Sequence, residues 1–242
     1  MAVIDPELLL RAYAIGVFPM SDSRDAREVF WVEPRRRAII PVDGFRLSRS
    51  LRKTLRAGPF EVSRDTAFAE VVRLCAEREE TWINEEIEAS YNELHRLGHA
   101  HSVECRRDGR LVGGLYGVRL GAAFFGESMF SLERDASKVA LAWLVARLKV
   151  GGFTLLDCQF MTEHLQSLGA VEIAQPDYLA LLSAALGEGW EGRSGAGAAF
   201  ARPAAGAGEF GALDRLLSAD PERTVDAPAS GCVIAQLLGK TS

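Results

Sequence analysis

The stretch HSVECRRDGRLVGGLYGVRLGAAFFGESMFS, residues 101–131, decides the fold class of this chain. An Asp-Gly pair at 108–109 separates two candidate strands, at 101–107 and 110–120, which is typical of a tight β-hairpin. The run at 122–131 continues the sheet. We therefore predict an antiparallel meander in the middle of the chain.

Helices and further strands flank this meander. Before it, we predict a strand at 60–65 and helices at 66–78 and 84–97. After it, we predict a helix at 135–150, a strand at 154–159, a short helix at 164–170, a strand at 171–173 and a final helix. This order predicts an α+β protein whose mixed sheet carries helices on both faces. It is also the element order of GCN5-related acyltransferases.

The chain divides into three predicted regions. Residues 1–59 form a small N-terminal domain, with a capped helix after Asp5, short strands at 30–34 and 38–42, and a basic helix at 45–58. Residues 60–190, whose element order resembles that of GCN5-related acyltransferases, are expected to form an acyltransferase-like catalytic domain. Residues 191–242 are a Gly/Ala-rich connector and a C-terminal tail, whose apolar end is expected to pack back onto the body.

The composition restricts the function classes. The 242 residues are 48% hydrophobic and carry a net charge of -5, which excludes a general nucleic-acid coat. The four cysteines show no CxxC spacing, so we expect neither a zinc site nor a disulfide framework, and we expect a reducing, cytoplasmic setting. No signal peptide and no apolar run long enough to span a membrane are expected.

Positive charge is concentrated in residues 35–56, which hold eight basic residues and one acid, Asp43. Arg49, Arg52, Lys53 and Arg56 share one face of the predicted helix. Such a face suits a phosphate backbone. The alternative is a solvated helix surface without a ligand.

Three aromatic residues are candidates for stacking on an unpaired base: Trp31, Trp82 and Tyr91. The alternative for each of them is packing in the core.

Polar side chains interrupt two apolar strands. Asp157 and Gln159 follow TLL, and strand alternation predicts that they point to one face while Cys158 points to the other. Glu127 stands between FFG and SMF in another strand. Buried acids are costly unless they are paired or functional, so these three residues form a candidate site for an ammonium group. The alternative is a buried pair that caps the following loop.

A candidate lipophilic pocket lies beside these acids. Leu141, Leu144 and Leu148 form one stripe of the predicted 135–150 helix, and Phe124 and Met129 flank Glu127. The same residues could equally be ordinary core.

Ten sequence blocks carry a resemblance to a known family. In order they are AYAIGVFPM, FWVEPRRRAIIP, RLSRSLRK, TWI, ASYNELHRLGHAHSVE, LVGGLYGV, FFGESMFS, DASKVAL, LLDCQ and HLQSLGA. Together, over residues 7–183, they resemble the leucyl/phenylalanyl-tRNA–protein transferase family.

The resemblance implies an aminoacyltransferase. Its donor would be leucyl-, phenylalanyl- or methionyl-tRNA, and its acceptors would be proteins with N-terminal Arg or Lys, which the added residue marks for degradation by the N-end rule. The family fold is a small N-terminal domain plus a GCN5-related acyltransferase-like domain. The resemblance also implies no metal and no cofactor. We expect a monomer with no membrane association.

Site residues follow from the same resemblance. The catalytic group comprises Asp157, which would contact the acceptor, Gln159, which would help activate the attacking amine, and the site acid Glu127. The remaining residues form two sets. The aminoacyl pocket would consist of Leu115, Phe124, Met129, Leu141, Leu144 and Leu148. The adenosine- and tRNA-binding set would consist of Trp31, Trp82, Tyr91, Arg49, Lys53 and Arg56.

Two other classes of protein stay open. One is a coenzyme A-dependent N-acyltransferase, but the segment FSLERDAS at 130–137 lacks the glycines of a pyrophosphate loop. The other is a catalytically silent tRNA- or peptide-binding module, which would explain the basic helix but not the acids in the strands.

Overall fold

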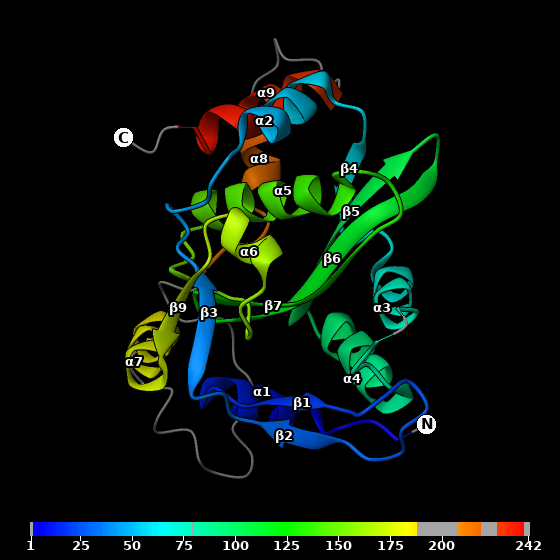
Figure 1. Cartoon of the computed structure of the whole chain (residues 1–242), viewed down its shortest axis with the longest axis vertical. Coiled ribbons are helices and arrows are strands. Elements are labelled where there is room, and N and C mark those ends of the chain that lie inside the picture. Colours follow the sequence, from blue (N-terminus) through cyan, green and yellow to red (C-terminus); the bar gives the residue numbers. More distant parts are fainter. Residues whose placement is uncertain (1, 79, 188–207, 219–226, 240–242) are drawn as a thin grey trace.

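The main sheet has seven strands in the order β4-β5-β6-β7-β8-β3-β9 (Figure 1). This computed structural model describes residues 2–78, 80–187, 208–218 and 227–239. The strands are β3 (Arg36–Ile40), β4 (Glu61–Arg64), β5 (Ala100–Arg107), β6 (Arg110–Leu120), β7 (Ala123–Ser131), β8 (Leu155–Asp157) and β9 (Val171–Ala174). Neighbouring strands are antiparallel except β7 and β8, which are parallel. The predicted mixed sheet is therefore present.

The predicted meander is confirmed in β5, β6 and β7. Asp108 (φ 51°) and Gly109 (φ 75°) both adopt left-handed backbone conformations between Arg107 and Arg110. Two positive φ values in a two-residue loop match the twist of antiparallel strands.

The sheet opens between β7 and β8. Helix α5 (Ala136–Val150) connects these parallel strands, which pair only over Ala123–Phe125 and Leu155–Asp157. Strand β7 then continues to Ser131 beside β6 alone. The opening therefore lies immediately beyond Phe125 and Asp157.

Helices cover both faces, as predicted. One core cluster lies under α5 and includes residues of α2 (Arg49–Ala57), α8 (Ala212–Ser218) and α9 (Ala227–Leu237). The other cluster lies under α1 (Pro6–Ala14), α3 (Phe68–Ala76), α4 (Glu85–Arg96) and α7 (Gln175–Leu186). The short α6 (Glu163–Ser167) precedes β9.

The N-terminal region is joined to the main sheet. Strands β1 (Phe18–Met20) and β2 (Phe30–Val32) form a separate two-stranded sheet, but β3 lies between β8 and β9. The predicted division after residue 59 stays a prediction, and the main sheet contains one strand from before it, β3, and six from after it.

The basic helix is shorter than the predicted 45–58. Ser48 is the N-cap of this helix, and its hydroxyl accepts a hydrogen bond from Leu51 N at 3.1 Å. Gly58 is the C-cap, with φ 58°. The predicted apolar C-terminal end packs onto the body as α9, whereas residues 191–207 of the predicted connector lie outside the described residues. None of the helices in the described ranges is long and apolar enough to cross a membrane.

Candidate functional site

The Asp157–Gln159 segment forms a tight turn where β8 ends. The prediction that these residues alternate within one strand is wrong, because the strand stops at Asp157 and Gln159 has φ 57°. This left-handed conformation is uncommon outside glycine. A hydrogen bond from Gln159 N to Asp157 Oδ1, 2.9 Å long, holds the turn.

Glu127 occupies a bulge in β7. The register shifts between Tyr116 and Gly117, which pair with Ser128 and Gly126, so Glu127 is the extra residue. Gly117 permits this geometry because a Cβ there would overlap the carbonyl oxygen of Phe125. A bulge re-aims one side chain, and here it turns a carboxylate into the protein.

Two tyrosines and Gln159 surround that carboxylate. Tyr13 Oη donates to Glu127 Oε1 at 2.7 Å, Tyr91 Oη donates to Oε2 at 3.0 Å, and Gln159 Nε2 donates to Oε1 at 3.3 Å. The hydroxyls of Tyr13 and Tyr91 are also 2.6 Å apart. Each of these three contacts between hydroxyl and carboxyl oxygens needs one hydrogen, but the two tyrosines supply only two. A proton on Glu127 would supply the third.

The environment of Glu127 favours that proton. Burial raises the pKa of Glu127 to about 7, and the Asp157 charge adds to the rise, although the hydrogen bonds from Tyr13 and Tyr91 and the charge of Arg37 oppose it. Burial also raises the pKa of both tyrosine hydroxyls, with the Glu127 charge adding to it, so both tyrosines remain neutral donors.

Asp157 forms a buried ion pair with Arg37. Arg37 Nε and Nη2 donate to its two oxygens at 2.9 and 2.6 Å, and Tyr178 Oη donates to Oδ2 at 2.9 Å. Arg37 is 1% exposed, its Nη1 donates to Gly16 O, and its guanidinium lies over the rings of Phe18 and Tyr178. Burial opposes the charge of Arg37, but the Asp157 carboxylate raises its pKa above the usual value. Both oxygens of Asp157 are therefore occupied and shielded from solvent.

Sequence reasoning missed three members of this cluster: Tyr13, Arg37 and Tyr178. Arg37 belongs to the basic segment, but strand alternation places it on the same face as Ile39, which is buried. This shared face was the available signal. Tyr13 and Tyr178 lie on distant helices, and no local pattern connects them to Glu127 or Asp157.

The six predicted pocket residues pack together in one core cluster, at the α5 face of the sheet. Leu115, Phe124, Leu141, Leu144 and Leu148 are buried there, and Met129 is partly buried. The carboxylate of Glu127 instead contacts tyrosines of the other cluster. The structure thus brings Glu127, Asp157 and Gln159 together, and separately brings the pocket residues together.

A groove of about 500 Å³ lies along the end of β7 that does not pair with β8. Met129, Arg78 and His164 line it, with Ser131 and Ser137 between them. Arg78 Nη2 donates to Ser128 Oγ at 2.8 Å, which ties the segment after α3 to the strand beside Glu127. Met129 is the one predicted pocket residue that reaches this groove.

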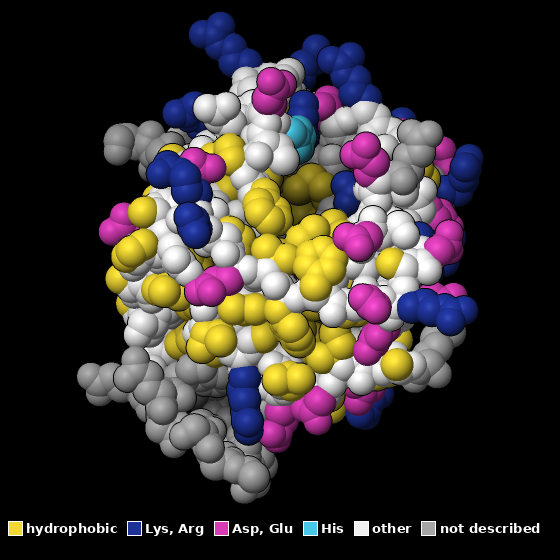
Figure 2. All heavy atoms as spheres, turned by 60° about the horizontal axis from the view of Figure 1, so that its bottom comes forward, with side chains coloured by type: hydrophobic (Ala, Val, Ile, Leu, Met, Phe, Trp, Pro, Cys, Tyr) yellow, Lys and Arg dark blue, Asp and Glu magenta, His cyan; other side chains and the backbone are white. Residues whose placement is uncertain are grey.

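The predicted stacking residues differ in accessibility. Trp31 is 42% exposed on β2, and Trp82 is half-buried with its ring perpendicular to Tyr91 at 6.4 Å. Tyr91 is fully buried, so its ring presents no free face for a base. Figure 2 shows the side of the molecule that carries α1 and β1–β2, where hydrophobic side chains surround a hollow.

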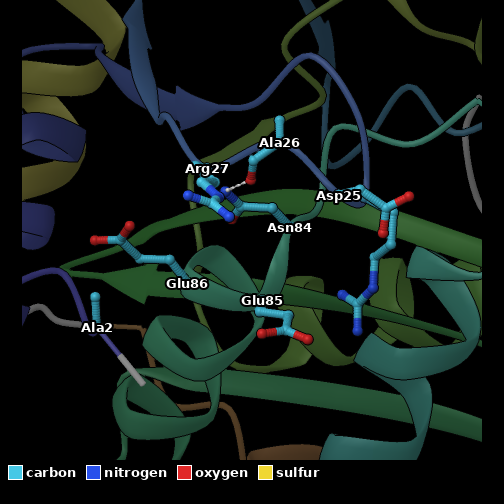
Figure 3. Close-up of a pocket in the computed structure, with 8 residues that line it drawn as sticks. Ala2, Asp25, Ala26, Arg27, Asn84, Glu85 and Glu86 are labelled. Carbon is cyan, nitrogen blue, oxygen red and sulfur yellow. Dashed lines mark hydrogen bonds between the residues drawn. The ribbon is translucent and has the colours of Figure 1, made fainter.

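Hydrogen bonds fix the loop after β1 against Trp82 and α4. Ser21 N donates to Trp82 O at 3.1 Å, and Asn84 Nδ2 donates to Ala26 O at 3.0 Å (Figure 3). The adjoining pocket of about 360 Å³, lined by charged residues including Asp25 and Glu85, contains none of the predicted site residues.

Three predicted tRNA-binding residues share the exposed side of α2. Arg49, Lys53 and Arg56 are exposed, while Leu51 and Leu55 are 2% exposed and face the core. In the part of the chain that the structure describes, no group of three or more His, Cys, Asp or Glu side chains is arranged to hold a metal ion.

Family models and sequence relatives match most of this chain. The leucyl/phenylalanyl-tRNA protein transferase family model matches residues 39–183, and the model of its N-terminal domain matches residues 3–35. A protein from Rhizorhabdus wittichii named leucyl/phenylalanyl-tRNA–protein transferase is 63% identical over 248 positions, covering 100% of both chains. One of the same name from Zymomonas mobilis is 62% identical, covering 76% of this chain and 70% of its own.

A solved structure, that of FemX, covers 73% of this chain and 71% of its own at 13% identity, with a TM-score of 0.47. On the family match and the full-length identity, the chain belongs to the leucyl/phenylalanyl-tRNA–protein transferase family.

Proposed function

We propose that this chain transfers leucine or phenylalanine, and also methionine, from charged tRNA to the N-terminal amine of proteins that begin with Arg or Lys. The observation that supports this most is the hydrogen-bonded series from Glu127 through Gln159 to Asp157, located where β7 and β8 separate. In this proposal, the substrate reaches these buried polar groups where the two strands separate.

The chemistry proposed for this site is ester aminolysis. The aminoacyl ester is already activated, so the protein mainly supplies proximity and orientation. The acceptor nitrogen attacks the ester carbon, the carbon–oxygen bond to the ribose breaks, and the proton lost by the amine ends on the ribose oxygen. The tRNA then leaves with a free hydroxyl.

Gln159 is the residue that would touch the attacking amine. Its Nε2 donates to Glu127, which leaves the amide oxygen as a hydrogen-bond acceptor for the amine N–H. Asp157 has no free oxygen, so we propose that it acts as a positioning residue, through its bond to Gln159 N. This differs from a direct contact between Asp157 and the acceptor.

The donor is proposed to bind in two parts. Its side chain would enter the apolar cluster from Met129, beside the groove. Its terminal adenosine would lie against Trp31 and Trp82, and its phosphates against Arg49, Lys53 and Arg56, which are exposed.

The parallel β7–β8 pair, with a helix between its strands and a gap beyond their paired ends, supports a GCN5-related type of acyltransferase fold for residues 60–190. We propose a monomer that acts in the cytoplasm, in keeping with four free cysteines. Its product would carry a new N-terminal residue that marks it for degradation by the N-end rule.

A transfer assay tests the proposal, using charged leucyl-tRNA and a model protein that begins with Arg. We expect Gln159→Ala to lose transfer while its tRNA binding and unfolding temperature stay near wild type. Gln166→Ala on α6 is the matched control, because this side chain is exposed and bonds to none of the cluster. Normal transfer by Gln159→Ala would refute the assignment.

A further inference from the structure

The C-terminal helices α8 and α9 lie outside the regions that the family models match, yet α9 packs against the basic helix α2 and α8 packs against α5. The matched regions are residues 3–35 and 39–183, whereas α8 and α9 lie beyond residue 207. Figure 1 shows α9 beside α2 at one end of the molecule, with α8 between them and α5. Among the described elements, α2 makes its main contacts with α9 and α5.

The α2–α9 contact is close enough to require a glycine. A Cβ on Gly231 would overlap the carbonyl oxygen of Leu55, so any larger residue would force the two helices apart. Ile234 follows on the same face of α9 and Leu238 lies just beyond its end, and both are buried in one cluster with Leu51 and Leu55. The buried side of α2 therefore rests on α9.

The exposed side of α2 is left free by this packing. Residues 227–239 contain no Asp, Glu, Lys or Arg, so α9 brings no opposing charge to the basic face. Arg52 is the exception among the basic residues of α2, since a Cβ at Gly239 would lie 2.9 Å from its Nη1. Arg52 thus faces the C-terminal end of α9, where a helix dipole favours positive charge.

The helix α8 ties this arrangement to α5. Asp214 Oδ1 and Oδ2 each accept a hydrogen bond of 2.7 Å from the guanidinium of Arg147, which is 4% exposed. Arg147 Nη1 also donates to Phe210 O at 2.8 Å. A bidentate pair at a half-buried site fixes orientation as well as position.

We propose that α9 supports the tRNA-facing helix α2 and so positions Arg49, Lys53 and Arg56 for the phosphate backbone of the donor. Arg52 belongs to the α2–α9 contact. This rests on the proposed function, since it assumes that α2 contacts tRNA. Gly231, Ile234 and Arg52 are accordingly positioning residues, and none of them touches the reacting atoms.

The test compares Gly231→Val with Cys232→Val, the next residue on the same helix, whose side chain is exposed. Transfer is measured from leucyl-tRNA at several salt concentrations and from leucyl-adenosine, a donor without tRNA phosphates. We expect Gly231→Val to raise KM for leucyl-tRNA about tenfold and to weaken its salt dependence, because phosphate contacts are misplaced. We expect its kcat and its rate with leucyl-adenosine to stay unchanged, and Cys232→Val to match wild type throughout.

Ile234→Ala provides a milder second variant, and hydrogen exchange of the α2 amides provides a direct readout. Faster exchange in α2 together with the KM effect supports the proposal that α9 positions α2. An unchanged KM in Gly231→Val, or an equal loss with leucyl-adenosine, overturns it. Arg49→Glu separates the positioning role of α9 from the tRNA-facing role of α2. If Arg49→Glu raises KM while Gly231→Val does not, only the positioning role of α9 is refuted. If neither variant raises KM, the tRNA-facing role of α2 is refuted as well.

Discussion

Gln159 Nε2 lies 3.3 Å from Glu127 Oε1, and this contact joins the turn after β8 to the bulge in β7. It crosses the point where the two parallel strands stop pairing. The orientation of the Gln159 amide therefore depends on a carboxylate contributed by a different strand.

This dependence gives a pH prediction. Because burial raises the pKa of Glu127 to about 7, its negative charge is present above pH 7 and is lost below it, which weakens the hydrogen bond that it accepts from Gln159 Nε2. We expect the transfer rate to fall as pH drops through about 7, and Glu127→Gln to remove that step. The measurement is transfer from leucyl-adenosine across pH 6–8.5, and an unchanged step in the Glu127→Gln variant would contradict the prediction.

Ionisation of the same Glu127 carboxyl group lowers the free energy of unfolding, although it favours transfer. Its folded-state pKa is raised, so the folded protein binds the proton more tightly than the unfolded chain. Stability should therefore decrease as pH rises from the unfolded pKa to about 7, through ionisation of this group. Chemical denaturation of wild type and Glu127→Gln at each pH checks the sign, since the variant should lose this slope.

The Arg37–Asp157 pair gives a stability prediction. Removing Arg37 alone leaves a buried, unpaired carboxylate, so Arg37→Met should cost about 3–5 kcal/mol of unfolding free energy. Replacing both residues, as Arg37→Met with Asp157→Leu, should recover much of that loss but not transfer activity, because Gln159 N loses its acceptor. A double variant as unstable as Arg37→Met would show that packing, not charge, decides the effect.

The basic face of α2 gives a binding prediction. Arg49→Glu should weaken tRNA binding and lower the slope of log K against log salt by about one, since each neutralised phosphate contributes close to that amount. Arg96→Glu, an exposed reversal on α4, is the control for net charge. Filter binding at four salt concentrations measures both slopes, and equal slopes would remove α2 from the interface.

The apolar cluster gives a prediction that separates pocket from core. Leu148→Ala removes a side chain that is 0% exposed and should cost about 2–5 kcal/mol of stability without changing donor preference. Met129→Ala, at the edge of the groove, should cost less and should change the ratio of leucine to phenylalanine transfer. Competition between the two charged tRNAs measures that ratio, and a constant ratio would assign Met129 to the core.

Local sequence determined the elements of this protein. The Asp-Gly turn and the apolar helix α5 are set by residues within a few positions of each other, so turn chemistry and local pattern predict them. The Ser48 cap is equally local, but the predicted helix at 45–58 began before it. Glu127, Asp157 and Gln159 were also predictable, because polar side chains in apolar strands are costly without partners.

The tertiary structure decided what those residues contact. Tyr13, Arg37 and Tyr178 reach the cluster from α1, β3 and α7, at sequence separations that no local pattern encodes. The left-handed turn at Gln159 and the bulge at Glu127 likewise arise from strand pairing and its register, not from intrinsic preference. Sequence thus specified the polar groups of the candidate site. Packing between distant segments specified how each group is oriented, because orientation depends on the partner of each hydrogen bond.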